Sequence, residues 1–461
     1  NGIYGAEYTF GLQNGSMDTE YYDDKYYLGV VTLKHFDGYN LEDIPGTNIT
    51  RVSFNAEISD YMFADTYWPA FKRSVQSGGA KGVMCSCNSV NGIPSCANDF
   101  LLNKTLRQDW GFDGYITSDS NNVANMYLTH NYTDSIPDAV IVSLKASTDI
   151  DSYLSTGMGG ISDDYGTYSP YTNYIPNLVN NGLLDESLVD KALYNSFKIR
   201  FELGLFDQPI NEQKYFNIPN TVINSEYHQE LNVLASRQVM TLLKNDNHVL
   251  PLNPDMFSTK KLAVIGPHYN ASTDLLLKGC YTGQICMDNT YDCVPSILTE
   301  LSKYIANSNN LIYAQGCNVP CQSNEGFNEA MTVANNADII ILVMGLNGTI
   351  ESEGHDRVNI SLPGLQYNLA SMICSLNKPT ILVLINGGII AIDNLSNECN
   401  SIIEAFYPGF RGAQAISETL FGDNVPGGKL AVTMYHSNYT LPQYSNYSVM
   451  NLNEGYGKTY R

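Results

Sequence analysis

The sequence has few basic residues and no hydrophobic run long enough to span a bilayer. It contains 25 Lys and Arg against 47 Asp and Glu, which gives a formal net charge of −22. Such a charge repels phosphate backbones and anionic lipid surfaces, so we expect neither nucleic acid nor a membrane as a partner. The longest apolar segments, 339–345 and 380–392, are short or interrupted by Asn and Gly, and we interpret them as buried strands.

Several motifs of metal and cofactor chemistry are also missing. The chain has no HExxH and no CxxC pairs with metal-ligand spacing, so we predict no metal site. The segment 266–270, GPHYN, follows an apolar run as a nucleotide-binding loop would, but no GxGxxG is present. A GxSxG elbow is absent too, which leaves a serine hydrolase without support. The sequence therefore predicts no cofactor.

Cysteine usage and sequons favour an oxidising compartment. Ten cysteines accompany ten Asn-x-Ser/Thr sequons, which predicts a secreted, extracellular or lysosome-like location. A cytosolic protein with inert buried thiols is the alternative. The chain begins at Asn1 and shows no leader, so we expect a processed chain or a fragment. The glycosylation candidates are Asn48, Asn103, Asn131, Asn270 and Asn438.

The first part of the chain alternates short apolar runs with amphipathic segments, which predicts parallel strands covered by helices. About four strands precede residue 206, whereas a closed (β/α)8 barrel needs eight, so the region is an open sheet or part of a barrel. The expected strands are 28–36, 82–88, 114–118 and 148–151. The expected helices are 58–77, 99–110, 138–146 and 174–203, the last interrupted at Asn181 and Gly182.

The remainder of the chain predicts a second α/β domain. Residues 207–222 are polar, contain two prolines and have no periodicity, as is typical of a linker. A helix is expected from Ser225 towards Leu243, followed by continuous apolar strands as in doubly wound sheets. These strands are 261–267, 337–345, 378–387 and 399–409. The predicted domains are 1–206 and 223–461.

Two groups of polar residues follow predicted strands in the first domain. Asp119 comes directly after a strand in GYITSDSNNV, and Lys34 and His35 end the strand in TLKHFDGYN. The carboxyl ends of parallel strands hold active sites in such folds, and there a carboxylate can attack an electrophile. The alternatives are that Asp119 caps the following helix and that His35 is structural.

A third group follows a strand of the second domain, in the segment 346–364, LNGTIESEGHDRVNISLPG. Three of its acidic residues, Glu351, Glu353 and Asp356, lie within six positions, with His355 and Arg357 beside them. A solvated charged loop is the alternative. The position after a strand end and the surrounding glycines favour a functional loop that reaches into a cleft.

Six ordered segments resemble glycoside hydrolase family 3, and two of them resemble its β-xylosidase-like branch. The resemblance implies a partial (β/α)8-type barrel followed by an α/β sandwich, with an oligosaccharide bound between them. It also implies a retaining exo-β-glycosidase that releases terminal β-D-xylosyl residues. An α-L-arabinofuranosidase, a β-glucosidase and a non-catalytic carbohydrate-binding relative are the alternatives. The segments are TLKHFDGYN, VMCSCNSVNGIPSCANDFLL, LRQDWGFDGYITSDS, TLLKNDNHVLPL, IESEGHDR and FYPGFRGAQAISETLFGDNVPGGKLAVT.

The resemblance also implies roles for individual residues. Asp119 matches the family's nucleophile and Glu353 its general acid/base, for which Glu351 is the competing candidate. Retention of configuration predicts that the two carboxyl groups act about 5–5.5 Å apart. The residues that would bind sugar hydroxyls are Lys34, His35 and Arg51.

The chain departs from the family pattern beside the proposed nucleophile. Cys87 stands where the family usually has a Tyr that hydrogen-bonds the nucleophile. Ser120 and Ser152 stand where the xylosidase-like branch usually has two cysteines, which implies a lost disulfide and a looser loop. By resemblance, the plausible remaining bridges are Cys85–Cys96 and Cys317–Cys321. The family pattern also implies further barrel strands before this chain and a fibronectin-like domain after it.

Overall fold

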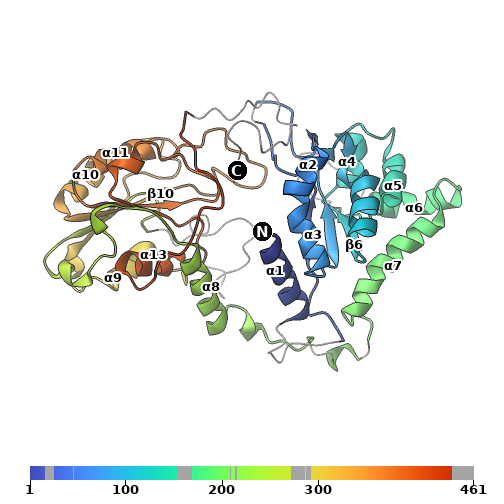
Figure 1. The fold of residues 1–461 in the computed structure, drawn as a ribbon, viewed down its shortest axis with the longest axis horizontal. Helices are drawn as coiled ribbons and strands as arrows, with labels where there is room; N and C mark the ends of the chain where they lie inside the picture. Colours follow the sequence, from blue (N-terminus) through green and yellow to red (C-terminus); the bar gives the residue numbers. More distant parts are fainter. Residues whose placement is uncertain are drawn as a thin grey trace. The chain divides into compact units, whose positions relative to one another are not determined.

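The computed structural model describes residues 1–15, 25–44, 46–153, 169–207, 209–212, 215–270, 286 and 292–438. These residues form two compact units (Figure 1). The first unit contains the described residues up to Ile218, and the second contains those from Pro219 onwards. The boundary falls within the expected linker 207–222, whose described part contains two short 3-10 turns, at Ile210–Glu212 and Asn220–Val222.

The first unit is built on a parallel sheet with the strand order β1-β3-β6. The strands are β1 (Thr32–Phe36), β3 (Gly82–Cys85) and β6 (Tyr115–Ser118). The expected fourth strand, 148–151, forms only a parallel bridge between Thr117 and Ile150. The predicted alternation of parallel strands and helices is therefore confirmed, with the fourth strand reduced to one bridge. A small separate sheet contains β2 (Asn55–Ala56), β4 (Ser89–Val90) and β5 (Ile93–Pro94).

Helices occur at each expected position along this part of the chain. Between β1 and β3 the helical segment consists of α2 (Asp60–Met62), the π-helix Phe63–Tyr67 and α3 (Trp68–Gln76). The hydroxyl of Ser59 caps its first turn by accepting a hydrogen bond from Met62 N at 3.3 Å. The other helices are the π-helix Phe100–Asp109, α4 (Asn122–Leu128), α5 (Ile136–Lys145), α6 (Pro170–Asn180) and α7 (Glu186–Glu202). The predicted interruption at 181–182 separates α6 from α7.

The helix α1 (Gly2–Asn14) was not predicted from the sequence. Its apolar side chains do not form a single buried stripe, because Ile3, Tyr4 and Tyr8 are exposed while the polar Thr9 and Gln13 are buried. Gln13 instead binds the backbone of the unit, since its Oε1 accepts hydrogen bonds from Val31 N at 3.2 Å and from Lys81 N at 3.1 Å. The amphipathic pattern that normally reveals a helix is consequently absent here.

A buried ion pair joins the sheet of the first unit to two of its helices. Arg107 Nη2 donates to Asp149 Oδ2 at 2.6 Å, and Asn195 Nδ2 on α7 donates to Oδ1 at 2.8 Å. The backbone N–H of Ile116 on β6 also donates to Asp149, at 2.7 Å. Burial raises the pKa of Asp149 to about 6, against the opposing charge of Arg107. These contacts fix the start of the strand whose far end carries Asp119.

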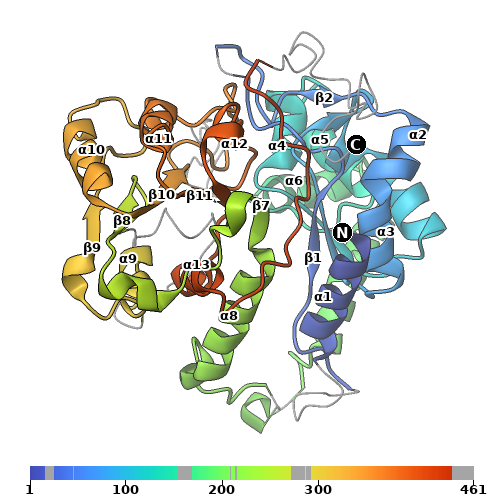
Figure 2. The same cartoon turned by 60° about the vertical axis from the view of Figure 1, so that its left-hand side comes forward.

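The second unit contains a six-stranded sheet with the order β7-β12-β11-β10-β8-β9. Its strands β8, β9, β10 and β11 are labelled in Figure 2. All neighbouring strands are parallel except β7 and β12. Four strands correspond to the predicted ones: β8 (Leu262–Ile265), β10 (Ile339–Gly345), β11 (Thr380–Ile385) and β12 (Ser401–Glu404). Each of them is completely buried, as expected for strands that are covered on both faces.

The prediction of one helix from Ser225 towards Leu243 is wrong at its C-terminal end. The helix α8 (Glu226–Val239) is followed by the strand β7 (Thr241–Asn245). This strand pairs antiparallel with β12, with Leu242 opposite Ile403. The Leu residues of this segment are compatible with a helix or a strand. Pairing with a strand about 160 residues away therefore determines that the segment forms a strand. The strand β9 (Leu311–Ala314), which pairs with β8 at the sheet edge, was also missed.

Alternate residues of the buried strands supply the two hydrophobic cores of the second unit. Ile341 and Val343 face the core completed by α9 (Ile297–Ser302) and α13 (Gly412–Phe421). Their neighbours Ile340 and Leu342 face the opposite core, which α10 (Phe327–Asn336), α11 (Gln366–Cys374) and α12 (Leu395–Glu398) complete. The helices thus cover both faces of the sheet, as the doubly wound pattern predicts (Figure 1).

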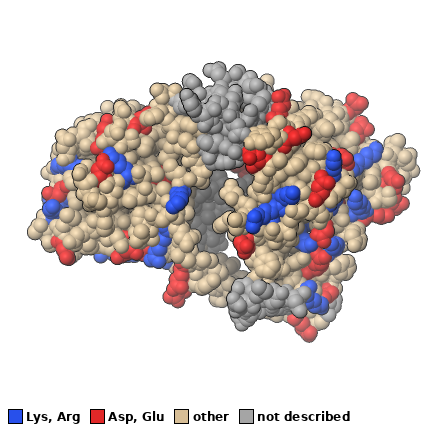
Figure 3. Space-filling model, viewed as in Figure 1, with Lys and Arg blue, Asp and Glu red and all other residues tan. Residues whose placement is uncertain are grey.

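Four disulfides occur within the described residues: Cys85–Cys96, Cys286–Cys293, Cys317–Cys321 and Cys374–Cys399. The first and third are the two pairs that the resemblance implied. Over the same ranges, none of the helices combines the length and the apolar character that a bilayer crossing needs. On the face drawn in Figure 3, Lys and Arg side chains lie singly or in small groups among acidic ones.

Candidate active site

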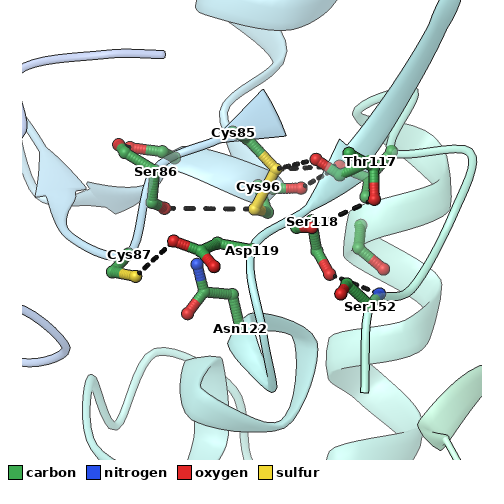
Figure 4. The surroundings of a disulfide bond; sticks show 12 residues. Cys85, Ser86, Cys87, Cys96, Thr117, Ser118, Asp119, Asn122 and Ser152 are labelled. Atoms are coloured by element: carbon green, nitrogen blue, oxygen red, sulfur yellow. Dashed lines mark hydrogen bonds between the residues drawn. A yellow bond between two sulfur atoms is a disulfide. The ribbon is translucent and has the colours of Figure 1, made fainter. Parts of the chain in front are cut away.

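The carboxylate of Asp119 is held at the carboxyl end of β6. Its Oδ1 accepts a hydrogen bond from Ser120 N at 2.6 Å, and its Oδ2 accepts one from Cys87 Sγ at 3.1 Å (Figure 4). His35 Nε2 lies 3.5 Å from Oδ2. The side chain of Asp119 is 22% exposed, so the carboxylate is oriented by the protein and still reachable by a ligand. The interpretation as a helix cap is wrong, because the N-cap residue of α4 is Asn121.

The loop that presents Cys87 is itself supported from two sides. Cys85, two residues earlier, is bonded to Cys96, and His130 Nε2 lies 2.9 Å from the carbonyl oxygen of Cys87. Burial lowers the pKa of His130, so the neutral ring can donate from Nε2 to this carbonyl and accept at Nδ1 from Ser89 Oγ, 3.0 Å away. His130 was not predicted from the sequence, where a lone His carries no signal.

The thiol of Cys87 is kept protonated by its surroundings. Burial raises its pKa, and the negative charge of Asp119 and the hydrogen bond to it act in the same direction. The side chain therefore serves as a donor towards Asp119 and not as a thiolate nucleophile. This donor occupies the place that the resemblance assigns to a phenol.

Further polar groups surround His35. The ring of Tyr39 packs edge-on against the imidazole with 4.9 Å between ring centroids, and the Tyr39 hydroxyl donates to Glu42 Oε2 at 2.7 Å. Arg51 Nη1 lies 3.5 Å from the same Glu42 oxygen, and its charge lowers the pKa of the Cys87 thiol. Tyr39 and Glu42 were missed, although both directly follow the Lys-His segment in the sequence.

The structure therefore brings four of the residues singled out in the first domain to one place. His35, Cys87 and Asp119 are in contact, and Arg51 is close enough to influence Cys87 electrostatically. Lys34 precedes His35 on β1 and has an exposed side chain.

Hydrogen bonds hold the Asp119 loop where the resemblance would place a disulfide. Asn121 N donates to the carbonyl oxygen of Ser152 at 2.8 Å, and Ser152 N donates to Ser118 Oγ at 2.9 Å. Ser118 and Ser152 lie side by side in Figure 4. The segments on either side of Asp119 are thus linked to the segment 150–152 without a covalent bond.

Glu353 lies in the second unit, on the loop that follows β10. It occupies a tight turn in which His355 N donates to Ser352 O at 3.0 Å. Gly354 has φ 79° in this turn, a conformation that other residues adopt only with strain. The turn leaves Glu353 exposed at its tip.

Glu351, the competing acid/base candidate, has the opposite environment. Its carboxylate accepts from Gly387 N at 2.6 Å, from Tyr407 Oη at 2.8 Å and from Arg357 Nε at 3.1 Å. The side chain is only 15% exposed. The two glutamates are two residues apart in sequence and differ in exposure.

A buried glutamic acid, Glu404, lies close to the segment that binds Glu351. Glu404, at the end of β12, accepts from Phe406 N at 3.0 Å and lies within hydrogen-bonding reach of Asn386. Burial, with a smaller effect from the nearby charge of Glu351, raises its pKa to about 8. Among the described residues, Glu404 Oε2 and Asn386 Oδ1 have no other hydrogen-bond partner. A proton on Glu404 allows it to donate to this amide oxygen, which satisfies both atoms.

This pKa shift predicts that Glu404 destabilises the fold as the pH rises. Between its ordinary pKa of 4.5 and about 8, the unfolded chain has released the proton that the folded chain retains. The stability that the neutral acid contributes is complete below pH 4.5 and is lost at about 1.4 kcal/mol per pH unit across this window. Glu404→Gln keeps the donor and removes the titration. We expect its advantage in free energy of unfolding over the parent chain to grow from pH 5 to pH 8, as measured by urea denaturation.

The comparison of the two chains isolates Glu404, because all other titrating groups are shared. A difference in unfolding free energy that stays constant from pH 5 to pH 8 would show that Glu404 has no raised pKa in the folded chain. Glu325→Gln, an exposed change of the same chemistry, should follow the parent at every pH.

The glycosylation candidates differ in accessibility. Asn103 Nδ2 donates to Asp99 Oδ1 at 2.6 Å and to Lys145 O at 2.9 Å, and a glycan would displace at least one of these hydrogen bonds. The other four candidates, Asn48, Asn131, Asn270 and Asn438, are exposed.

No cluster of three or more His, Cys, Asp or Glu side chains in the described ranges could hold a metal ion. His268, in the GPHYN segment after β8, is fully buried, and burial lowers its pKa to about 4.

The described site is a carboxylate at the carboxyl end of a parallel strand, held by a backbone amide and a neutral thiol donor within an α/β fold. Comparison with known protein families identifies the family of the chain. Residues 3–195 match the N-terminal domain of glycosyl hydrolase family 3, and residues 240–460 match the C-terminal domain of the same family. The chain belongs to glycosyl hydrolase family 3. Its fold accordingly consists of a barrel-type domain followed by an α/β sandwich domain, as predicted.

Several of the similar proteins are xylosidases. The chain is 39% identical over 434 residues to probable β-D-xylosidase 6 of Arabidopsis thaliana, covering 93% of this chain and 51% of that one. It is 33% identical to β-xylosidase/α-L-arabinofuranosidase 2 of Medicago sativa subsp. varia, covering 95% and 53%. A solved exo-β-xylosidase of the family, in complex with a xylobiose aziridine probe, superimposes with TM-score 0.84 at 30% identity, covering 100% and 55%. The chain thus spans about half the length of these relatives.

Proposed function

We propose that this chain carries the catalytic residues of a secreted, retaining exo-β-glycosidase that removes terminal β-D-xylosyl residues from oligosaccharides. The observation that carries the proposal is the oriented carboxylate of Asp119 with Cys87 and His35 beside it. In the double displacement, the Asp119 carboxylate attacks the anomeric carbon and forms a glycosyl-enzyme ester, and water later breaks this ester. The partner is an oligosaccharide, and the reaction needs no cofactor.

Glu353 is proposed as the general acid and base. It must give a proton to the leaving oxygen in the first step and take one from water in the second. Glu353 is exposed at the tip of a turn, where its carboxyl can exchange protons with substrate and water, whereas the side chain of Glu351 is only 15% exposed. This contrast supports Glu353 over Glu351.

The residues around Asp119 are proposed to bind the terminal sugar. His35 and Arg51 lie near the carboxylate and can donate to sugar hydroxyls, and Lys34 lies next to His35 on β1. Cys87 is proposed to orient the nucleophile. A thiol is a weaker donor than a phenol, so the orienting hydrogen bond is correspondingly weak.

An α-L-arabinofuranosidase is the second candidate function. The observation in its favour is the similarity to the Medicago protein, whose name includes both activities. A β-glucosidase has weaker support, from a solved enzyme of Erythrobacter marinus at 28% identity. The third candidate is a carbohydrate-binding relative without turnover, which the replacement of the usual Tyr by Cys87 favours.

A panel of aryl glycosides tests the proposal. The 461-residue chain should release nitrophenol from the β-xyloside faster than from the α-L-arabinofuranoside or the β-glucoside. A 2-fluoro-xyloside should leave a covalent mass on the peptide that contains Asp119. Binding of xylo-oligosaccharides without turnover or labelling would establish the carbohydrate-binding alternative instead.

Removal of the Cys87 donor should have a moderate effect on the proposed reaction. Cys87→Ala leaves Asp119 Oδ2 without this hydrogen bond, and we expect kcat/KM on the β-xyloside to fall about threefold to tenfold, or about 0.7–1.4 kcal/mol. Cys87→Ser keeps a donor and should stay within about twofold of the parent. Equal losses in both variants would show that the volume of the sulfur matters and that the hydrogen bond does not.

A secretory location is proposed from the disulfides. Four occur in the described part of the chain, which is typical of proteins that fold in an oxidising compartment. Digestion with an endoglycosidase that removes N-glycans should lower the mass of the protein isolated from its native source, with glycans on exposed sequons such as Asn48 and Asn131.

A further inference from the structure

The carboxylate of Glu351 is bound by four residues of the second unit. Gly387 N donates to Oε1 at 2.6 Å, and Gly388 N lies 3.2 Å from Oε1 and 3.1 Å from Oε2. The Tyr407 hydroxyl donates to Oε1 at 2.8 Å, and Arg357 Nε donates to Oε2 at 3.1 Å. Both oxygens of the carboxylate are therefore saturated, and the charge is neutralised by a guanidinium that is itself largely buried.

The donors come from loops at the ends of neighbouring parallel strands. Glu351 and Arg357 belong to the loop after β10, the two glycines follow β11, and Tyr407 follows β12. Arg357 Nη2 also donates to the carbonyl oxygen of Ile389 at 2.7 Å, which adds a second link between the first two loops. One carboxylate thus fastens the loop after β10 to the loops of both strands beyond it.

Glycine at positions 387 and 388 leaves room for this arrangement. A Cβ on Gly388 would lie 2.6 Å from Arg357 Nη2 and 2.9 Å from Glu351 Oε2. A Cβ on Gly387 would lie 2.9 Å from the Tyr407 ring and 3.1 Å from Glu351 Oε1. Side chains at these two positions would crowd the carboxylate and its partners, so glycine at both positions leaves room for the backbone to approach Glu351.

The turn formed by Gly387 and Gly388 is itself held by Asn386. Asn386 Nδ2 donates to the carbonyl oxygen of Gly388 at 2.9 Å, and Asn386 lies within reach of the buried acid Glu404. Asn386 is fully buried at the end of β11. The turn that receives Glu351 is consequently preformed by the sheet.

We propose that Glu351 is a positioning residue that fixes the loop carrying Glu353, two residues further along the chain. The proposal rests on the function proposed above, since the consequence of a displaced loop is a displaced acid/base. Glu351 itself touches neither substrate nor the reacting atoms in this role. Its carboxylate converts an exposed loop into one with a defined conformation, so that the exposed glutamate starts from a fixed position.

The test uses Glu351→Gln in the full 461-residue chain, with Glu325→Gln as the matched control on the same unit. The amide keeps the size of the side chain, but it places an NH2 group where Gly388 N or Arg357 also donates. We expect amide hydrogen exchange across 346–357 to become at least tenfold faster in Glu351→Gln and to remain unchanged in the control. Tyr407→Phe, which removes a single donor, should give a smaller increase in the same segment.

Kinetics then separate positioning from proton transfer. We expect Glu351→Gln to lower kcat on the β-xyloside about tenfold to 100-fold, with KM changed less than threefold and with the pH profile of kcat unchanged in shape. Glu353→Gln, by contrast, should lose the basic limb of that profile. Unchanged exchange in Glu351→Gln would overturn the proposal, as would faster exchange with unchanged kcat.

Two further outcomes are distinguishable. If Glu351→Gln loses the basic limb while Glu353→Gln retains it, Glu351 is the acid/base and the positioning role is wrong. If the parent chain shows no turnover or covalent labelling, the proposed function fails, and the exchange measurement still decides whether Glu351 fixes the loop.

Discussion

Asp119→Asn should abolish covalent labelling by a 2-fluoro-xyloside and lower turnover of the aryl β-xyloside by about 10³-fold or more. The reason is that an amide oxygen is a far weaker nucleophile than the carboxylate oriented by Ser120 N and Cys87 Sγ. Intact-protein mass after incubation with the probe measures the first effect, and nitrophenol release measures the second.

The matched control for this change is Asp134→Asn, an exposed Asp in the same unit. It should label and turn over like the parent chain. Unfolding free energies of both variants should be measured alongside, since a loss of activity with an intact fold is the informative result. An Asp119→Asn protein that still acquires the covalent mass would show that another side chain is the nucleophile.

Glu353→Gln should produce a loss that depends on the leaving group. For an alkyl β-xyloside, whose leaving oxygen needs a proton, we expect kcat/KM to fall about 10²-fold to 10⁴-fold. For a dinitrophenyl β-xyloside, which departs as a stable anion, the same constant should fall less than about tenfold. Added azide should raise kcat of the variant with the activated substrate, because a small anion can attack the glycosyl-enzyme ester without a general base.

The comparison between leaving groups is the internal control. Equal losses on both substrates would argue that Glu353 shapes the loop and transfers no proton. No loss on either substrate would remove Glu353 from the mechanism, and attention would then turn to the other carboxyl groups of the loop after β10.

Much of the fold could be predicted from the sequence, because a strand that is buried on both faces consists mainly of apolar residues. The strands around Leu262–Ile265, Ile339–Gly345 and Thr380–Ile385 are continuous apolar runs, and each was predicted at its place. The strand Thr241–Asn245 was instead assigned to a helix, since its state depends on pairing with Ser401–Glu404. Local patterns report which faces are buried, and they do not report a partner that is distant in sequence.

In the candidate site, too, some residues could be predicted from the sequence and others only from the structure. The positions of Asp119, His35 and Glu353 at or after the ends of predicted strands marked them as candidates, and the family resemblance assigned their roles. The residues around the Cys87 thiol and the His35 imidazole could not be predicted in this way. Glu42, Tyr39 and His130 are ordinary polar residues in the sequence, and only their contacts reveal what they support.

The amino-acid sequence alone determined the two α/β domains, the family and the acidic residues at strand ends. The tertiary structure decided that Glu351 is enclosed while Glu353 is exposed, although both stand in one charged run. The physical reason is that parallel neighbouring strands end at one edge of the sheet. There, loops that are tens of residues apart in the chain supply the hydrogen-bond donors that enclose one carboxylate and leave the other exposed.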